Sequence, residues 1–179
     1  IIVDLLEKQK KIIPLGTTPD ILRINYGQTG FYRVGYPNGS LSKLKFTISN
    51  KDLGPLDRWG MQNDLFELSR NGEVTLDKYL DFTKSYFNED NYLVLSDVYQ
   101  NMRAIQFVFS QEAFWNSIWQ RFSNYHKETF KRILDRLGWE PKAGESQTDS
   151  LLRELAIRYC GFAEDTEVLV EVKKRFEDY

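Results

Sequence analysis

Two stretches in the first third of the chain decide its fold. They are Gly27-Gln28-Thr29-Gly30-Phe31-Tyr32-Arg33-Val34-Gly35-Tyr36 and Pro55-Leu56-Asp57-Arg58-Trp59-Gly60-Met61-Gln62-Asn63-Asp64. The first begins with a turn bounded by glycines and continues with the alternating side chains of a strand. The second begins with proline, which suits the first turn of a helix, and places an acid near the positive end of the helix dipole. The sequence therefore predicts a change from strands to helices between these stretches.

Residues 1–37 are predicted to be the end of a small β-sandwich domain. Short β-branched or alternating runs, which are typical of strands, occur at residues 1–3, 11–13, 21–26 and 31–36. Pro14 follows the second run and indicates a strand end or a sheet edge, because proline cannot donate to a β-ladder.

Residues 38–179 are predicted to be the first part of a larger α-helical domain. Caps, glycines and amphipathic spacing predict helices at about residues 55–70, 75–88, 92–108, 111–137, 148–159 and 165–176. The short loops favour antiparallel neighbours. The predicted fold class is therefore mainly α, with an irregular HEAT- or armadillo-like antiparallel helical array preceded by a partial β-sandwich. A stack without a capping repeat would leave an apolar face open at its end.

Bulk properties limit the partners of this protein. The chain has 179 residues, a formal net charge of -2 and 15% aromatic residues, so it has enough apolar material for a folded core. Basic residues are not clustered as a nucleic-acid site requires, and no apolar run approaches the ~18 residues of a membrane span. A single cysteine favours a reducing, cytoplasmic location. Because the first residue is Ile1 rather than Met, we expect a piece of a longer protein.

The sequence also excludes several kinds of active site. The chain has one histidine, His126, and one cysteine, Cys160, so it holds neither an H-E-x-x-H zinc motif nor a Cys-x-x-Cys pair. Phosphate-loop, nucleophile-elbow and dinucleotide-binding glycine motifs are missing as well. We therefore expect no catalytic, cofactor-binding or metal-ligating residue in this chain.

Three stretches, in the correct order, resemble the M1 family of zinc aminopeptidases. Residues 27–36 are similar to the family's strand motif before its helical domain, and residues 57–64 to its D-R-x-G-L-x-D-D helix. The third stretch comprises Arg136-Leu137-Gly138-Trp139, Glu145-Ser146 and Leu151-Leu152-Arg153. Asn63 and Gln147 depart from the Asp and His that many members carry. The resemblance covers nearly the whole chain and favours the puromycin-sensitive or tricorn-interacting branch.

The resemblance implies a four-domain parent enzyme that releases N-terminal amino acids from peptides by means of zinc-activated water. Its zinc ligands, general base and amine-binding acids belong to other domains, so none is carried over to this chain, and zinc is expected only in the parent. In that family the helical domain closes over the active site and limits which peptides enter. The implied partners are peptide substrates and the catalytic domain, and the chain alone is expected to be inactive.

Four polar residues have both a functional and a structural interpretation, and we favour the structural one. Arg33 is either an anion clamp for a peptide carboxylate or an ion-pair partner across the sandwich–helix junction. Asp57 and Arg58 either face substrate, or form a helix-start acid and an arginine that tethers the sandwich. His126 is either a general base or a satisfied histidine.

Other side chains also have both a functional and a structural interpretation, and we again favour the structural one. The aromatic stripe lines a peptide channel or belongs to the core; its members are Phe114, Trp115, Trp119 and Phe122. Glu128 and Asp135 are a carboxylate pair or two solvated acids. Cys160 is interpreted as a small buried residue.

Two other functions remain open from the sequence. The chain is alternatively a stand-alone helical-repeat module that binds a peptide or protein on its concave face. It is also possible for an incomplete sandwich to form a homodimer through exposed strand edges.

Overall fold

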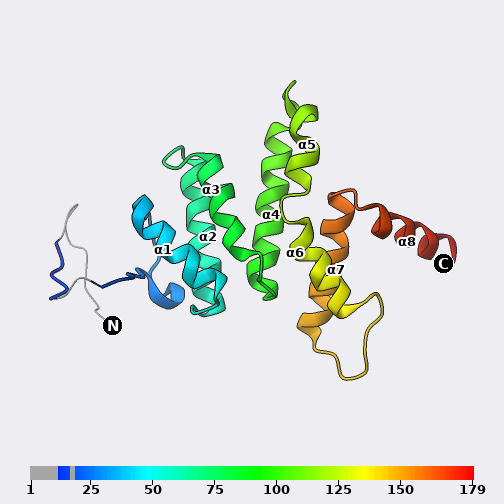
Figure 1. Ribbon diagram of the computed structural model, residues 1–179, viewed down its shortest axis with the longest axis horizontal. Coiled ribbons are helices and arrows are strands. Elements are labelled where there is room, and N and C mark those ends of the chain that lie inside the picture. The colour runs from blue at the N-terminus through cyan, green and yellow to red at the C-terminus, as the bar shows by residue number, and fades with distance from the viewer. Residues whose placement is uncertain (1–11, 17–18) are drawn as a thin grey trace.

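The computed structural model describes residues 12–16 and 19–179, and α-helices dominate it (Figure 1). The helices are α1 (Asn38–Ser49), α2 (Pro55–Arg70), α3 (Leu76–Thr83), α4 (Tyr92–Phe109), α5 (Trp115–Ser123), α6 (Lys127–Leu137), α7 (Gln147–Phe162) and α8 (Thr166–Glu177), with the 3-10 turns η1 (Tyr26–Gln28) and η2 (Lys84–Tyr86). The mainly α prediction is confirmed.

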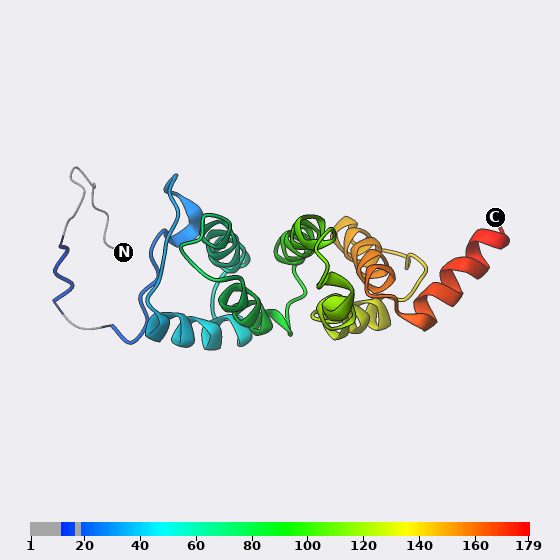
Figure 2. The same cartoon turned by 90° about the horizontal axis from the view of Figure 1, so that it is seen from above.

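The helices form two layers (Figure 2). Helices α2, α4 and α7 lie side by side in one layer, and α1, α3 and α6 lie in the other. The α6–α7 hairpin is the most extensive helix pair, and α7 also packs on α4, which packs on α2. This alternation between layers is the arrangement expected of an irregular helical array. Within the described residues, no helix is long and apolar enough to cross a membrane.

The core lies between the two layers and is rich in aromatic side chains. The largest fully buried side chains include Tyr79, Tyr86, Tyr159, Phe82 and Phe130. The rings of Phe130 on α6 and Tyr159 on α7 stack with their centroids 4.2 Å apart. Aromatic pairs of this kind add about 0.5–1.5 kcal/mol to the burial of their area, which helps to fix the α6–α7 hairpin.

The strands predicted at residues 21–26 and 31–36 are not strands in the structure. In place of a ladder, side chains accept the hydrogen bonds of this segment's backbone: the Ile24 amide donates to the Tyr36 hydroxyl at 2.9 Å, and the Gly30 amide donates to Asn25 Oδ1 at 2.7 Å. A β-strand needs a neighbouring strand, and the described part of the chain supplies none. Residues 12 and 13 are also not in a strand, and the run at 1–3 lies outside the described residues. The described residues therefore offer no strand edge for the predicted homodimer.

The single long helix predicted over residues 111–137 is wrong, because the segment forms two helices, α5 and α6. Helix α5 ends at Ser123, and His126 has φ -116° and ψ 11°, which are not helical angles. The break buries His126, whose Nε2 lies 3.0 Å from Thr83 Oγ1 on α3. An uninterrupted amphipathic pattern did not reveal this break, because the residues on both sides of it face the same core.

Two other helix boundaries differ from the prediction. Helix α7 does not stop before Gly161 but continues to Phe162, whose ring packs on Trp119 with centroids 5.2 Å apart. The helix predicted over residues 75–88 is an eight-residue α-helix followed by the 3-10 turn η2. Tertiary packing outweighs local propensity at these ends.

Candidate functional site

Two carboxylates on α2 hold the preceding segment of chain against this helix. Asp57 and Asp64 are two turns apart and therefore lie on the same face of α2. Their side chains are 4% and 2% exposed. We call this site the α2 anchor; its members are Arg23, Gly27, Arg33, Val34, Asp57 and Asp64.

The first half of the α2 anchor is built on Asp57. Its Oδ1 accepts a hydrogen bond from the Gly27 amide at 2.8 Å and lies 3.3 Å from Arg23 Nη2. Gly27 has φ +68°, a left-handed angle that glycine adopts without a steric penalty. The Arg23 side chain is 6% exposed, and its Nη1 donates to the Tyr36 hydroxyl at 2.9 Å. Asp57 therefore binds a turn in which glycine adopts the left-handed angle.

The second half of the α2 anchor is built on Asp64. Its Oδ2 accepts from the Val34 amide at 3.3 Å, and its Oδ1 lies 3.1 Å from Arg33 Nη1. Arg33 also donates to Asn63. The structural interpretation of Arg33, as an ion-pair partner of the helical region, is the one that the contacts support, although its side chain remains 50% exposed.

Gly60 leaves room for the Gln28 side chain against α2. A Cβ atom added at Gly60 would overlap the side-chain amide of Gln28, which ends the turn η1. A Cβ atom at position 60 would therefore displace the Gln28 side chain from its place against the helix. The glycine that separates the two carboxylates of the α2 anchor thus has a packing role.

Arg58 does not tether the N-terminal segment, as its position beside Asp57 suggested. Its side chain is 5% exposed, and it makes a two-point ion pair with Glu89, with Nε–Oε2 at 2.6 Å and Nη2–Oε1 at 2.9 Å. Glu89 is 1% exposed and also accepts from the Asn91 amide, at the start of α4. Arg58 therefore joins α2 to the turn that leads into α4.

Asn63 links the α2 anchor to a carboxylate on α4. Its Nδ2 donates to Asp97 Oδ2 at 3.1 Å, and Gln62 donates to the same oxygen. Burial raises the pKa of Asp97, against the opposing effect of these hydrogen bonds. At position 63, where many members of the resembled family carry Asp, this chain therefore has a neutral donor beside a carboxylate on α4.

A second buried ion pair joins two parts of the third family-like stretch. Arg153 on α7 donates through Nη1 to Glu145 Oε1 at 2.7 Å and through Nε to the Gly138 carbonyl at 2.8 Å. The side chains of Arg153 and Glu145 are 6% and 8% exposed. The hydrogen bond from Arg153 lowers the pKa of Glu145 to about 2. We call this pair the α6–α7 clasp, because it fastens the loop between α6 and α7. Gln147 begins α7 and is exposed.

The isolated reactive residues are buried rather than placed in a cleft. His126 is 3% exposed, and burial lowers its pKa to about 4, so it is neutral at pH 7. Cys160 is fully buried, and burial raises the pKa of its thiol to about 12. The structural interpretations of both residues agree with this geometry. Glu128 and Asp135 are exposed acids on α6.

The aromatic stripe belongs mainly to the core. Trp115 and Phe122 are 6% and 7% exposed, and their rings lie 5.2 Å apart. Trp119 packs against Phe162 and donates from its indole nitrogen to Glu164 at 2.8 Å. Only Phe114, at 49% exposure, projects outward to a large extent.

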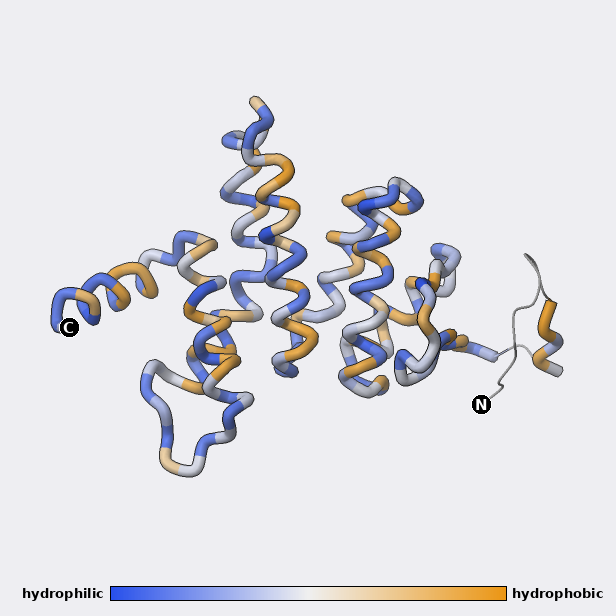
Figure 3. The backbone as a smooth tube through the Cα atoms, turned by 180° about the vertical axis from the view of Figure 1, so that it is seen from behind, coloured by the Kyte–Doolittle hydropathy of each residue, from blue (hydrophilic) through white to orange (hydrophobic). Residues whose placement is uncertain are grey.

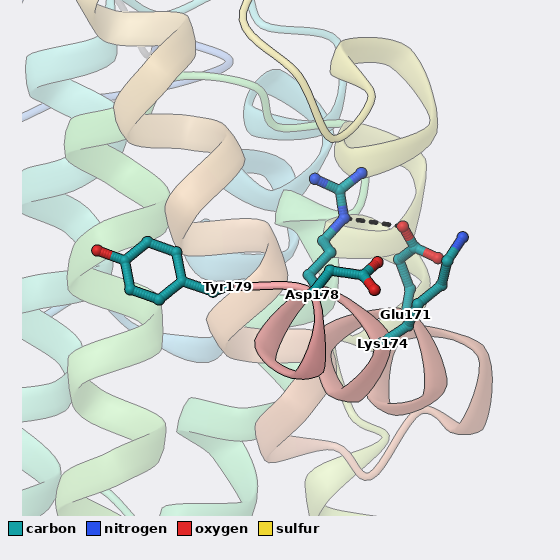
Figure 4. Close-up of a pocket in the computed structure, with 5 residues that line it drawn as sticks. Glu171, Lys174, Asp178 and Tyr179 are labelled. Atoms are coloured by element: carbon teal, nitrogen blue, oxygen red, sulfur yellow. Dashed lines mark hydrogen bonds and ion pairs between the residues drawn. The ribbon is translucent and has the colours of Figure 1, made fainter.

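One surface hollow among the described residues is lined mainly by charged side chains. This hollow of about 360 Å³ lies at the end of α8 and is lined by Glu171, Lys174, Arg175, Asp178 and Tyr179. Figure 4 shows the Tyr179 ring pointing away from the charged side chains. Among the described residues, no three His, Cys, Asp or Glu side chains are grouped as a metal site would require.

Comparison with known proteins identifies the family. Residues 21–179 match the ERAP1-like C-terminal domain. The chain belongs to this family, as a C-terminal portion of an M1 aminopeptidase. It is similar to Aminopeptidase M1 of Arabidopsis thaliana (32% identity over 88% of this chain) and to the puromycin-sensitive aminopeptidase of Caenorhabditis elegans (26% over 98%). It is also similar to the tricorn protease-interacting factor F2 of Thermoplasma volcanium (26% over 75%). The chain spans only 18%, 18% and 16% of these relatives.

Three partners in these sites were not found from the sequence. Arg23, Glu89 and Asp97 lie outside the three family-like stretches, and each meets α2 from about 31 to 35 residues away in the chain. Arg23 lies within the alternating run at residues 21–26, which by itself indicated no polar contact. Glu89 and Asp97 carried no distinguishing pattern.

Proposed function

We propose that this chain is the non-catalytic helical portion of a zinc aminopeptidase, where it closes over the active site and controls peptide access. The match of residues 21–179 to the ERAP1-like C-terminal domain carries the proposal. The α2 anchor supports it, because two family-like stretches bind each other there through the buried carboxylates of Asp57 and Asp64. A helical array that gates a chamber has to be held in a fixed orientation to the preceding domain.

The proposed domain division is at residue 37, with the end of a β-sandwich before it and the helical domain after it. Six large apolar side chains between residues 21 and 32 are 40% or more exposed: Ile21, Leu22, Ile24, Tyr26, Phe31 and Tyr32. Such a surface is expected on a segment that another part of the parent covers. The single cysteine supports a reducing compartment, and we place the parent in the cytoplasm.

Zinc and the chemical step belong, in this proposal, to the rest of the parent enzyme. The described residues do not fit a zinc site, since they contain no cluster of three potential ligands and the one histidine is buried against Thr83. This chain's contribution is therefore to shape and close the space in which a peptide is bound.

A chimaera tests the gating role. The matching region of the Arabidopsis relative is replaced by this chain, and kcat/KM is measured for an aminoacyl reporter and for peptides of increasing length. We expect the length profile to change while hydrolysis of the short reporter changes little. An unchanged length profile, both in the chimaera and after deletion of the region, would contradict the proposal.

The alternative binding-module function is tested on the chain alone. A module that works by itself binds a peptide without the catalytic domain, whereas a gating domain requires it. We expect calorimetric titration with peptides that are substrates of the relative to give no heat of binding. Saturable binding of such a peptide to the isolated chain would favour the module.

A further inference from the structure

Two Asn-Gly pairs lie on the surface of this protein, one at the start of a helix and one just after the end of another. Asn38 and Gly39 are the first two residues of α1, and Asn71 and Gly72 follow α2. All four residues are exposed. Asparagine deamidates most readily before glycine, because a glycine has no Cβ to hinder attack by its own backbone nitrogen. Which pair reacts then depends on the hydrogen bonds around each glycine nitrogen.

The pair after α2 is held by backbone hydrogen bonds. The Gly72 amide donates to the Ser69 carbonyl at 3.1 Å, and the next amide, that of Glu73, donates to the Leu68 carbonyl at 3.0 Å. Bonds of this kind close the end of a helix and fix the peptides that follow it. Rotation of the Asn71–Gly72 peptide toward the Asn71 side chain would break them, so the fold protects this pair.

The pair at the start of α1 lacks this restraint. The Gly39 amide is one of the first-turn amides that a helix leaves without a carbonyl partner, and no other group among the described residues accepts its hydrogen bond. Pro37 precedes the helix and provides no side-chain cap. The turn is held by the Ser40 and Leu41 amides, which both donate to the Pro37 carbonyl at 3.0 Å. Because helix ends fray, this turn opens and brings the Gly39 nitrogen to the Asn38 side chain.

We propose that Asn38 is a deamidation site, at the point where the segment held by the α2 anchor enters the helical array. The Gly39 nitrogen attacks Cγ of Asn38, the bond from Cγ to the side-chain nitrogen breaks, and the proton lost by Gly39 leaves on ammonia. Water then opens the five-membered ring at either of its two carbonyls. One opening gives aspartate, and the other gives isoaspartate, in which the backbone runs through the side-chain carbon. Water is the only co-reactant, and nothing is oxidised or reduced.

The two products have opposite effects on α1. An aspartate at position 38 places a negative charge at the positive end of the helix dipole, which stabilises α1. Isoaspartate lengthens the backbone by one carbon, so the amides of Ser40 and Leu41 no longer reach the Pro37 carbonyl. In Figure 1, and from behind in Figure 3, α1 lies at the edge of the array beside the N-terminal segment. The isoaspartate form therefore loosens the array at this edge.

Peptide mapping by mass spectrometry measures the reaction. The folded chain is incubated at physiological temperature and mildly alkaline pH, and aspartate and isoaspartate are quantified over time at positions 38 and 71. We expect position 38 to react about tenfold faster or more, because only the Gly72 nitrogen has to lose a hydrogen bond. In urea, where both pairs are unfolded, we expect similar rates. Equal rates in the folded chain, a faster reaction at position 71, or protection of both positions by the fold would each overturn the proposal.

The variant Gly39→Ala tests the chemical route. A Cβ atom at position 39 meets no atom within 4 Å, so the variant is expected to keep the fold, which circular dichroism checks. Because the added methyl group hinders attack by the nitrogen, we expect deamidation at position 38 to slow by about tenfold, with position 71 unchanged. An unchanged rate at position 38 would show that water removes the amide directly, and would overturn the ring-closing step.

Amide hydrogen exchange separates the effects of the two products. We expect the Ser40 and Leu41 amides to exchange faster in the purified isoaspartate form than in the unmodified chain. The variant Asn38→Asp carries the charge without the longer backbone, and it is expected to keep the slow exchange of both amides. Slow exchange in the isoaspartate form would overturn the proposed loosening of α1.

Discussion

The α2 anchor and the α6–α7 clasp are both built from buried carboxylates and arginines, but they join parts of the chain at very different separations. The clasp pairs Glu145 with Arg153, eight residues away, and fastens a single loop. In the α2 anchor, Asp57 and Asp64 reach backbone amides 30 residues away and hold a segment without regular structure. The third family-like stretch therefore stabilises a single loop, whereas the first two stretches contribute by binding each other.

The largest effect is expected at the ion pair beside the α2 anchor. Arg58→Met leaves the Glu89 carboxylate buried without its partner, and we expect a loss of about 3–5 kcal/mol in the free energy of unfolding. Urea unfolding measures it. Arg70→Met on the same helix is the control, because the Arg70 side chain is 63% exposed and its removal changes stability little. Equal losses in the two variants would show that the Arg58–Glu89 ion pair contributes no more to stability than an exposed arginine does.

The next largest effect is a pH dependence that distinguishes the buried His126 from the α6–α7 clasp. Because the pKa of His126 is about 4 in the folded chain and about 6.5 when unfolded, the unfolded state binds more protons between these values. Stability is therefore full above about pH 6.5 and falls by about 3 kcal/mol as the pH drops to 4. The clasp titrates lower: Glu145 has a depressed pKa of about 2, so its contribution is lost only as the pH falls from about 4.5 toward 2.

Unfolding titrations of the unmodified chain and of His126→Gln separate these contributions. His126 is the only histidine, so the variant is expected to lose the stability change between pH 6.5 and 4. It retains the change at lower pH. A variant with the same pH profile as the unmodified chain would exclude His126 as the source.

A local effect is expected at the clasp. Arg153→Met removes the donors to Glu145 and to the Gly138 carbonyl, and the loop of residues 138–146 is then free to move into solvent. We expect a smaller loss of stability than for Arg58→Met, with faster amide exchange confined to this loop and the start of α7. Arg158→Met, on the exposed side of α7, is the control. Exchange that increases across both layers would contradict a local role.

The smallest effect concerns the carboxylate that faces Asn63. Asn63→Asp places a second acid about 3 Å from Asp97 and is expected to cost about 1 kcal/mol at pH 7, because two carboxylates at this separation repel each other. The added Asp97→Asn substitution is expected to recover most of the loss. A double-mutant cycle measures the coupling. A coupling energy near zero would show that the two positions are independent.

The sequence predicts those structural features that depend on residues close together in the chain. Pro55 and Asp57 locate the start of α2, and Gly138 locates the end of α6, since each acts on its own turn. The pairing of Arg58 with Glu89 was not predictable, because nothing in either stretch marks the other. The strand prediction was wrong for a related reason. Alternating side chains in residues 21–36 indicate only that the two sides of the segment have different surroundings, and here α2 lies on one side instead of a neighbouring strand.

The predicted absence of site residues rested on a simple count of one histidine and one cysteine. The count could not predict the break between α5 and α6 at residues 124–126, which directs the His126 side chain into the core. Its position between two amphipathic helices gave no sign of the turn, since helix periodicity is similar on both sides.

Amide hydrogen exchange at Gly27 and Val34, followed by NMR, tests the α2 anchor most directly. Asp57→Ala is expected to speed exchange of the Gly27 amide by about tenfold, and Asp64→Ala that of Val34, because each removes the acceptor of that amide. Asp77→Ala, an exposed acid in the first turn of α3, should change neither. Amides of Gly27 and Val34 that exchange without protection in the unmodified chain would contradict the anchor.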